Sequence, residues 1–134
     1  METPDGEAHP HPFDPAAVAA AQAVAVSADE AHELAELLGV IGDPVRSRIL
    51  SALAAAGELC VGDTAIALSV SEDAASYGLR VLRTAGLIER RREGRLIYHR
   101  LRDSGARAAL VAALHDLREL ATARSGPDVE NDEE

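Results

Sequence analysis

The chain has 134 residues and a formal net charge of −10, and its composition is 47% hydrophobic but only 2% aromatic. This length suits one domain with a modest core built from Ala, Leu, Val and Ile, of which Ala and Leu favour helices. No apolar run reaches the ~20 residues that span a bilayer. The acidic, proline-broken N-terminus is unlike a signal peptide, and a single cysteine cannot form an intrachain disulfide. We therefore expect a mainly helical cytoplasmic protein with no membrane partner.

The charges are distributed unevenly along the chain. Residues 1–42 carry eight acids and no base, and residues 108–134 carry seven acids and two arginines. Residues 43–107 carry eleven arginines against eight acids, and the chain has no lysine. A mildly basic middle between acidic ends is compatible with nucleic-acid binding despite the overall negative charge.

Helix signals dominate the first half of the chain. Residues 1–26 are expected to form an N-terminal arm that could include a first helix, with Asp14 as its cap and Pro15 at its first position. A stronger helix is predicted over residues 27–42, because Ser27 and Glu30 form a capping box and the apolar residues keep helical spacing. Another helix is predicted from the Asp43 cap to a glycine stop at residue 57.

The second half contains two short helices, a hairpin and a long helix. The segments VGDTAIALS and SEDAASYGLRVLRTAG are separated only by the tight turn of a helix-turn-helix, with Ser71 as the cap. Residues 87–101 switch to strand formers around REGR, where Gly94 is expected at positive φ, which predicts a β-hairpin. The helix expected over residues 103–124 is too apolar on one side for a solvated helix, so we expect it to pack on another chain. Residues 125–134 are expected to be a disordered acidic tail.

A helix-turn-helix followed at once by an arginine-rich hairpin predicts a winged helix. The expected fold class is mainly α (α+β), with a winged helix-turn-helix domain and its C-terminal dimerisation helix over residues 27–124. The second helix of such a pair enters the major groove of DNA, and arginines at the hairpin tip suit phosphates. The alternative is a winged helix that binds only protein. The candidate DNA-binding residues are Ser71, Ser76, Tyr77, Arg80, Arg83, Arg90, Arg91, Arg92 and Arg95.

Three segments together resemble the ArsR/SmtB family of bacterial repressors over about residues 30–120: LGVIGDPVRSRILSAL, ELCVGDTAIALSVSEDAASYGLRVLRTAGLIERRREGRLIYHRL and the C-terminal helix. The resemblance implies a homodimeric repressor. It would bind a double-stranded operator with dyad symmetry and release it when an inducer, usually a metal ion, binds. The family often has Ser-His-Gln in the recognition helix, where this chain has Ser76, Tyr77 and Gly78. Gly78 costs about 1 kcal/mol of helix propensity relative to Ala, and the operator sequence cannot be carried over.

The resemblance also implies a metal site at the single cysteine. In the zinc, cadmium and lead sensors of the family, the cysteine of ELCVGD and the aspartate three residues later are ligands, which match Cys60 and Asp63. The other subunit's arm completes the site, and here the arm offers His9 and His11. This donor set suits zinc, and cadmium, lead and nickel remain open. Gly62 replaces a second cysteine found in some relatives, which excludes a thiolate-rich site.

A second family site lies on the C-terminal helix. Its positions hold Asp103, Gly105, Asp116 and Glu119, so both family histidines are absent, and His115 is displaced by about 100° around the helix. Asp103 and Asp116 lie about 20 Å apart along a helix, so only antiparallel helices in a dimer could bring them together. A weak site is implied at Asp103, His115, Asp116 and Glu119, although Asp103 could instead cap the helix.

Other interpretations stay open. Cys60 could be a core residue, because free cysteine is among the most buried residue types. A family member without metal sensing could respond to redox change at Cys60 or to another ligand, although no cation adjoins this thiol in sequence. His99 is expected to be exposed or to contact a phosphate. An enzyme is not expected, since there is no nucleophile elbow, phosphate loop or HExxH pattern.

Overall fold

The computed structural model describes residues 11–104 and 106–126, and the chain divides into two compact units, Met1–Glu36 and Leu37–Glu134. The first unit contains α2 (Pro15–Ala23) and the start of α3 (Ala28–Ile41). Both predicted caps are confirmed: Asp14 accepts a hydrogen bond from the Ala17 backbone at 3.0 Å, and Ser27 and Glu30 bond reciprocally at 3.0 and 3.1 Å. His9 and residues 127–134 of the predicted tail lie outside the described residues.

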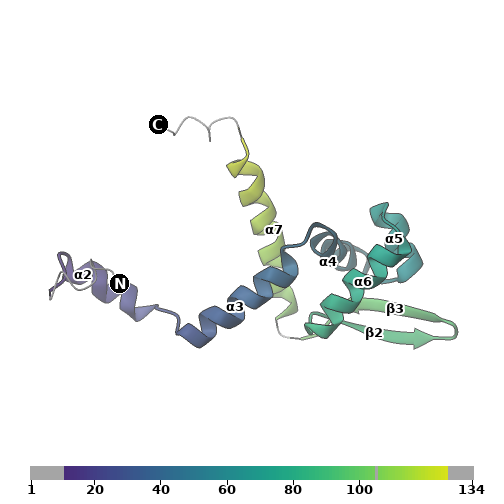
Figure 1. Cartoon of the computed structure of the whole chain (residues 1–134), viewed down its shortest axis with the longest axis horizontal. Helices are drawn as coiled ribbons and strands as arrows, with labels where there is room; N and C mark the ends of the chain where they lie inside the picture. Colours follow the sequence, from purple (N-terminus) through teal and green to yellow (C-terminus); the bar gives the residue numbers. More distant parts are fainter. Residues whose placement is uncertain (1–10, 105, 127–134) are drawn as a thin grey trace. The chain divides into compact units, whose positions relative to one another are not determined.

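The second unit is a winged helix-turn-helix, as the sequence predicts. Helices α5 and α6 form the helix-turn-helix, and the β2–β3 hairpin follows α6 and lies beside it (Figure 1). Ser71 caps α6 by accepting from the Ala74 backbone at 3.0 Å, and Gly94 turns the hairpin at φ +64°. The elements in chain order are α4 (Pro44–Ala56), β1 (Glu58–Cys60), α5 (Val61–Leu68), α6 (Glu72–Thr84), β2 (Ile88–Glu93), β3 (Leu96–Leu101) and α7 (Arg107–Arg124).

The sheet has a third strand that the sequence pattern did not predict. Strand β1 pairs antiparallel with β3, so the strand order is β1-β3-β2. Three residues are too few to show the alternation that identifies a strand, and the partner of β1 lies about 40 residues away. The register places Leu59, His99 and Arg90 in one row across the three strands. Directly opposite residues share a face of the sheet, so this row fixes which side chains lie together.

The core is aliphatic and lies where α4 and α6 meet the sheet. Ile49, Leu50, Leu53, Leu79, Leu82 and Ile88 are all at most 1% exposed. Gly78 is buried at the contact between the two helices, and a Cβ there would lie 2.8 Å from Cδ1 of Ile49. A side chain at this position would therefore require the end of Ile49 to shift within the core.

Two arginines of the basic middle hold helix ends rather than facing a partner. Arg46 donates from Nε to the Val40 carbonyl at 2.7 Å, which satisfies the C-terminal end of α3. Arg48 donates from Nη2 to the Leu68 carbonyl at 2.7 Å, which does the same for α5. Cations are favoured at helix C-termini, where carbonyl groups lack partners within the helix.

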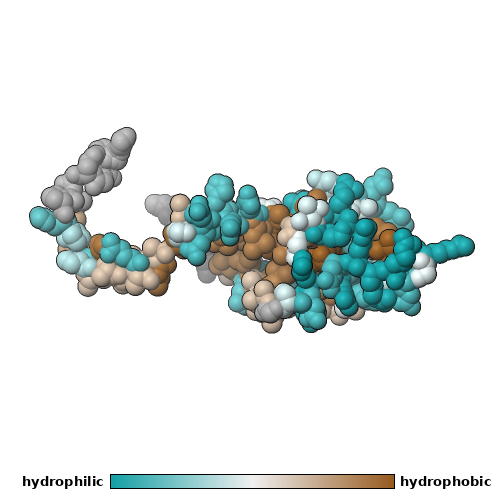
Figure 2. All heavy atoms as spheres, turned by 90° about the horizontal axis from the view of Figure 1, so that it is seen from below, coloured by the Kyte–Doolittle hydropathy of each residue, from teal (hydrophilic) through white to brown (hydrophobic). Residues whose placement is uncertain are grey.

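Helix α7 leaves part of its apolar surface exposed. Leu114 is buried against the core, whereas Val111, Leu117 and Leu120 are 38%, 46% and 59% exposed. In Figure 2 hydrophobic residues are exposed near the middle of the view, and mostly hydrophilic residues cover the end with the helix-turn-helix and hairpin. The capping role considered for Asp103 is wrong: α7 begins after Ala106 without a side-chain cap. Among the described helices none has both the length and the apolar character to cross a membrane.

Candidate nucleic-acid interface and metal ligands

Helix α6 is strongly amphipathic, and its polar side is available to a partner. Ala75 and Leu79 are buried. On the other side Ser76 and Tyr77 are exposed, and Arg80 is exposed one turn further on. The Arg80 guanidinium lies 5.4 Å from the centroid of the Tyr77 ring, a cation–π contact that orients both side chains. Ser71, at the N-terminal cap, is also exposed. The side of α6 that a major groove would contact is therefore polar and carries a cation.

A cleft of about 590 Å³ lies between α6 and the wing. Its lining brings together five of the nine candidate DNA-binding residues, from two elements that are separate in sequence. The recognition helix and the wing therefore face the same side of the second unit. The five are Ser76, Arg80 and Arg83 from α6, Arg90 from β2 and Arg95 from the hairpin turn.

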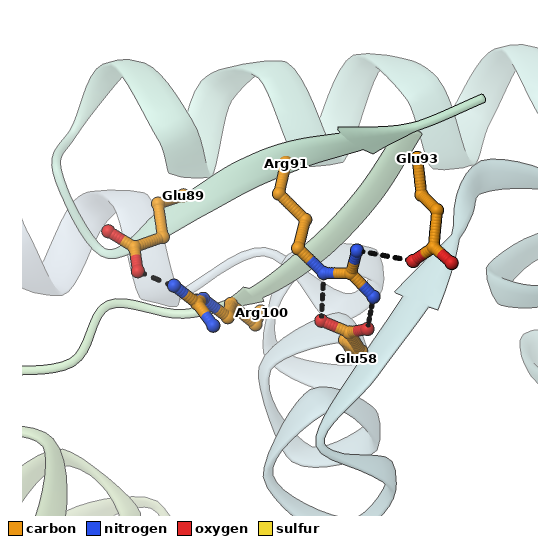
Figure 3. A network of polar contacts seen from close by, with 5 residues as sticks. All are labelled: Glu58, Glu89, Arg91, Glu93 and Arg100. Atoms are coloured by element: carbon orange, nitrogen blue, oxygen red, sulfur yellow. Dashed lines mark hydrogen bonds and ion pairs between the residues drawn. The ribbon is translucent and has the colours of Figure 1, made fainter. Parts of the chain in front are cut away.

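The three consecutive wing arginines do not form one cluster. Side chains alternate along a strand, so Arg90 and Arg92 share one face of β2 and Arg91 lies on the other. Arg91 there makes a two-pronged ion pair with Glu58 of β1 and bonds Glu93 at 2.6 Å (Figure 3). Its guanidinium also lies 4.9 Å from the centroid of the Tyr98 ring. Neither Arg91 nor Arg92 lines the cleft.

Ion pairing on this outer face shifts the titration of both partners. The hydrogen bond from Arg91 holds the pKa of Glu58 below its ordinary value, against a smaller opposing effect of burial. Glu58 and Glu93 in turn raise the pKa of Arg91. A second pair, Arg100 with Glu89 at 3.0 Å, extends the network along the same face. The charged side chains on this face therefore pair with one another within the sheet, and they are less available to an external partner.

Of the two expectations for His99, exposure is wrong, and contact with a phosphate stays a prediction. His99 is only 6% exposed and lines the cleft, rather than being exposed on the wing. Burial lowers its pKa, the charges of Arg83 and Arg90 lower it further, and a hydrogen bond with the Leu59 backbone opposes them. The signal that could have found it is strand alternation, since His99 shares a face with the buried Leu101.

Cys60 and Asp63, the implied metal ligands, lie at the start of α5. Cys60 is a half-buried free thiol at the N-cap of this helix, and its carbonyl accepts from Thr64 Oγ1 at 2.8 Å. Asp63 is exposed in the first turn, and His11 is exposed in the first unit. Within the described ranges no three His, Cys, Asp or Glu side chains gather as a metal cluster. A metal at Cys60 and Asp63 would therefore need donors from elsewhere.

The candidate second metal site on α7 is only partly assembled. His115 Nε2 lies 3.4 Å from Glu119 Oε2, as their one-turn spacing predicts. Asp103 instead pairs with Arg107 at 3.6 Å, and Asp116 is exposed. One subunit thus joins two of the four proposed donors.

Comparison with known proteins gives consistent matches. Residues 43–90 match the family described as "Bacterial regulatory protein, arsR family". The chain is 47% identical over 79 residues to a transcriptional repressor SmtB homolog of Synechocystis sp., covering 59% of each protein, so it spans about three fifths of that relative. It is 33% identical over 90 residues to a cadmium resistance transcriptional regulatory protein CadC homolog of Staphylococcus aureus, covering 67% of this chain and 74% of the relative.

Solved structures agree with the sequence matches. The crystal structure of the AntR antimony-specific transcriptional repressor superposes with a TM-score of 0.63 at 30% identity, over 74% of this chain and 88% of that one. These matched proteins are transcriptional regulators, which confirms the expectation of a regulator rather than an enzyme. The sequence identity, the coverage and the shared winged-helix fold lead to one conclusion: the chain belongs to the ArsR family of bacterial regulatory proteins.

Proposed function

We propose that the chain is a transcriptional repressor that binds duplex DNA with α6 in the major groove and the wing against the backbone. The observation that carries this proposal is the shared cleft, where helix and hairpin present arginines on one side. A recognition helix alone could serve protein binding, but a polar helix beside a cationic wing offers groups for both the bases and the phosphates of DNA.

The proposal is supported by how many arginines have no carboxylate partner among the residues that the structure describes. Of the eleven arginines in residues 43–107, two hold helix ends and three (Arg91, Arg100 and Arg107) form ion pairs. Within the described part of the chain, the other six have no carboxylate partner. Cations without carboxylate partners on one face attract a polyanion and make its binding salt-dependent. Five of these six lie on α6 or the wing: Arg80, Arg83, Arg90, Arg92 and Arg95.

Selection from a random duplex library tests DNA binding without any assumption about the operator sequence. Several rounds at low salt should enrich a sequence with dyad symmetry, and the purified protein should retard that duplex more strongly than a scrambled one. Failure to retard any duplex at low salt would favour the protein-binding alternative.

We also propose that the protein acts as a homodimer through α7. The exposed Val111, Leu117 and Leu120 support this, because such a row is costly to leave in water. Light scattering should give the dimer mass for the wild type and a monomer, or a much weaker dimer, for Leu117→Glu. Ala123→Glu adds the same charge about 120° around the helix and should remain dimeric. A dimer that withstands Leu117→Glu would rule out this face.

The inducer is proposed to be a metal ion, with zinc first and cadmium, lead or nickel as alternatives. Cys60 and Asp63 supply a thiolate and a carboxylate, and His9 and His11 of the partner subunit would add imidazoles, a donor set that zinc accepts. The exposed Asp63 and the half-buried thiol are compatible with this role. The weaker site at Asp103, His115, Asp116 and Glu119 is a further candidate, with only the His115–Glu119 pair in its support.

Strand β1 offers a route from these ligands to the wing. Cys60 ends β1 and precedes α5, and it is paired in register with Tyr98 of β3. A force applied at Cys60 and Asp63 therefore acts on the first helix of the helix-turn-helix and on the sheet that carries the wing. This connection is how metal binding would change the placement of DNA-binding groups.

Zinc titration of wild type beside Cys60→Ser tests the metal proposal. The wild type should bind zinc in competition with a chromogenic chelator and release its selected duplex, and Cys60→Ser should do neither at the same concentrations. Asp116→Asn, altered only at the second site, should still respond. If zinc acts equally on wild type and Cys60→Ser, this site is wrong. Release by peroxide from wild type alone would favour redox sensing instead.

A further inference from the structure

The inner wall of the α6–wing cleft holds a buried imidazole with an unsatisfied nitrogen. His99 is only 6% exposed, and within the described residues its Nδ1 has no hydrogen-bond partner. Buried polar atoms are nearly always paired, because an unpaired one costs the free energy of its lost hydration. Because His99 lines the cleft, a ligand held there is a candidate partner for this buried nitrogen.

The charges around this imidazole indicate the kind of ligand. Arg83 from α6 and Arg90 from β2 lie close enough to depress the ionisation of His99. Arg80 and Arg95 line the same cleft, and Glu72 is the only carboxylate in its lining. Strand β1 contributes the thiol-bearing Cys60, and helix α5 contributes Val61 and Gly62. Within the described residues Arg83, Arg90 and Arg95 have no ion pair, so the cleft has an excess of positive charge suited to an anion.

We propose that the cleft is an oxyanion site that takes a phosphate group, with Nδ1 of protonated His99 donating to one oxygen and Arg83 and Arg90 neutralising the charge. In the DNA complex the group would be a backbone phosphate, and without DNA a free phosphate could fill the site. Only the first source depends on the function proposed above.

Binding at this site requires one proton. With the proton of the neutral ring on Nε2, Nδ1 carries no hydrogen and has no partner among the described residues. The neutral ring therefore presents a lone pair at Nδ1, which an anion would not approach. A proton taken from solvent converts Nδ1 into a donor, and the bound anion offsets the two arginine charges that, after burial, lower the pKa of His99.

The site can be tested by nitrogen NMR of the imidazole rings in the wild-type protein. In inorganic phosphate the pKa of His99 should rise by at least about one unit over its value in chloride of equal ionic strength, which corresponds to about tenfold tighter binding to the protonated form. The signals of His115, which is exposed and does not line the cleft, serve as an internal control for general effects of the two salts. Identical titration of His99 in phosphate and chloride would overturn the proposal.

Variants separate a phosphate site from general charge attraction. Arg90→Gln, on the cleft face of the wing, should weaken phosphate binding severalfold, whereas Arg100→Gln on the opposite face removes the same charge and should not. Equal weakening by both would show charge attraction alone and contradict the site. His99→Gln should also abolish the proton coupling, and Arg90→Gln keeps the test decisive if that buried variant fails to fold.

The same measurements made with the selected duplex distinguish the two sources of phosphate. If the selected duplex is bound and His99→Gln removes the pH dependence of its affinity, the operator backbone fills the cleft. If no duplex is bound but phosphate still shifts His99, the repressor proposal fails and a free-oxyanion site stands. If the duplex is bound normally while neither phosphate nor His99→Gln has an effect, the repressor proposal stands and the oxyanion site is refuted.

Discussion

Arg90 and Arg91 are adjacent, identical in charge and placed on opposite faces of the wing. Arg90 lines the cleft and has no carboxylate partner among the described residues, whereas Arg91 is held by Glu58 and Glu93. Replacing each with glutamine removes one positive charge at nearly the same point in the sequence. Comparing Arg90→Gln with Arg91→Gln therefore distinguishes the loss of a direct phosphate contact from the loss of one unit of net charge.

The expected size of the difference follows from counterion release. Each neutralised phosphate contributes about −0.9 to the slope of log affinity against log salt, so Arg90→Gln should reduce the steepness by about that amount. Between about 50 and 200 mM salt, the affinity ratio of wild type to Arg90→Gln should then shrink about 3–4-fold. Arg91→Gln should leave the slope nearly unchanged and lower the Tm slightly, because it removes an exposed ion pair.

Fluorescence anisotropy with a labelled selected duplex, measured over a series of salt concentrations, gives both slopes. Thermal unfolding followed by circular dichroism gives the accompanying change in Tm. An equal loss of slope in Arg90→Gln and Arg91→Gln would refute the division of the wing into two faces. A lower slope in Arg91→Gln alone would mean that the outer face contacts DNA.

Two further predictions concern stability. Gly78→Ala should destabilise the protein by about 1 kcal/mol in urea unfolding, because overpacking against Ile49 outweighs the gain in helix propensity; a net gain would contradict the close helix contact. Glu58→Gln should flatten the loss of Tm in acid. The lowered pKa of Glu58 gives stability that is present above about pH 4.5 and is lost as the pH falls through the lowered value, and an unchanged acid profile would contradict this.

Local signals in the sequence predicted most of the fold. Each of the four predicted side-chain caps, at Asp14, Ser27, Asp43 and Ser71, accepts the expected backbone hydrogen bond three residues on. These interactions succeed as predictions because both partners lie within one helical turn. Strand β1 could not be recognised in the same way, since its pairing with β3 depends on residues about 40 positions away.

The candidate site was predicted in composition but not in arrangement. Counting arginines treats residues 90–92 as one cluster, whereas the period of two in a strand sends Arg91 to the opposite face. The neighbouring Arg100 suggests exposure or a phosphate contact for His99, whereas its cross-strand neighbour Leu59 and the alternation of β3 place it inward. Helix propensity alone makes Gly78 unfavourable. Its close contact with Ile49, which a side chain would disturb, is seen only in the folded structure.

Strand alternation also resolves the conflict between an acidic protein and a polyanionic partner. On the outer face of the sheet, three carboxylates (Glu58, Glu89 and Glu93) are paired with two arginines (Arg91 and Arg100), so this face has no excess of positive charge. On the inner face the strand positions carry Arg90 and Arg92 and no acid, beside the arginines of α6. The net charge of −10 therefore averages over surfaces of opposite character. A phosphate near the cleft is attracted by local cations, because screening limits charges elsewhere to a range of about 8 Å at physiological salt.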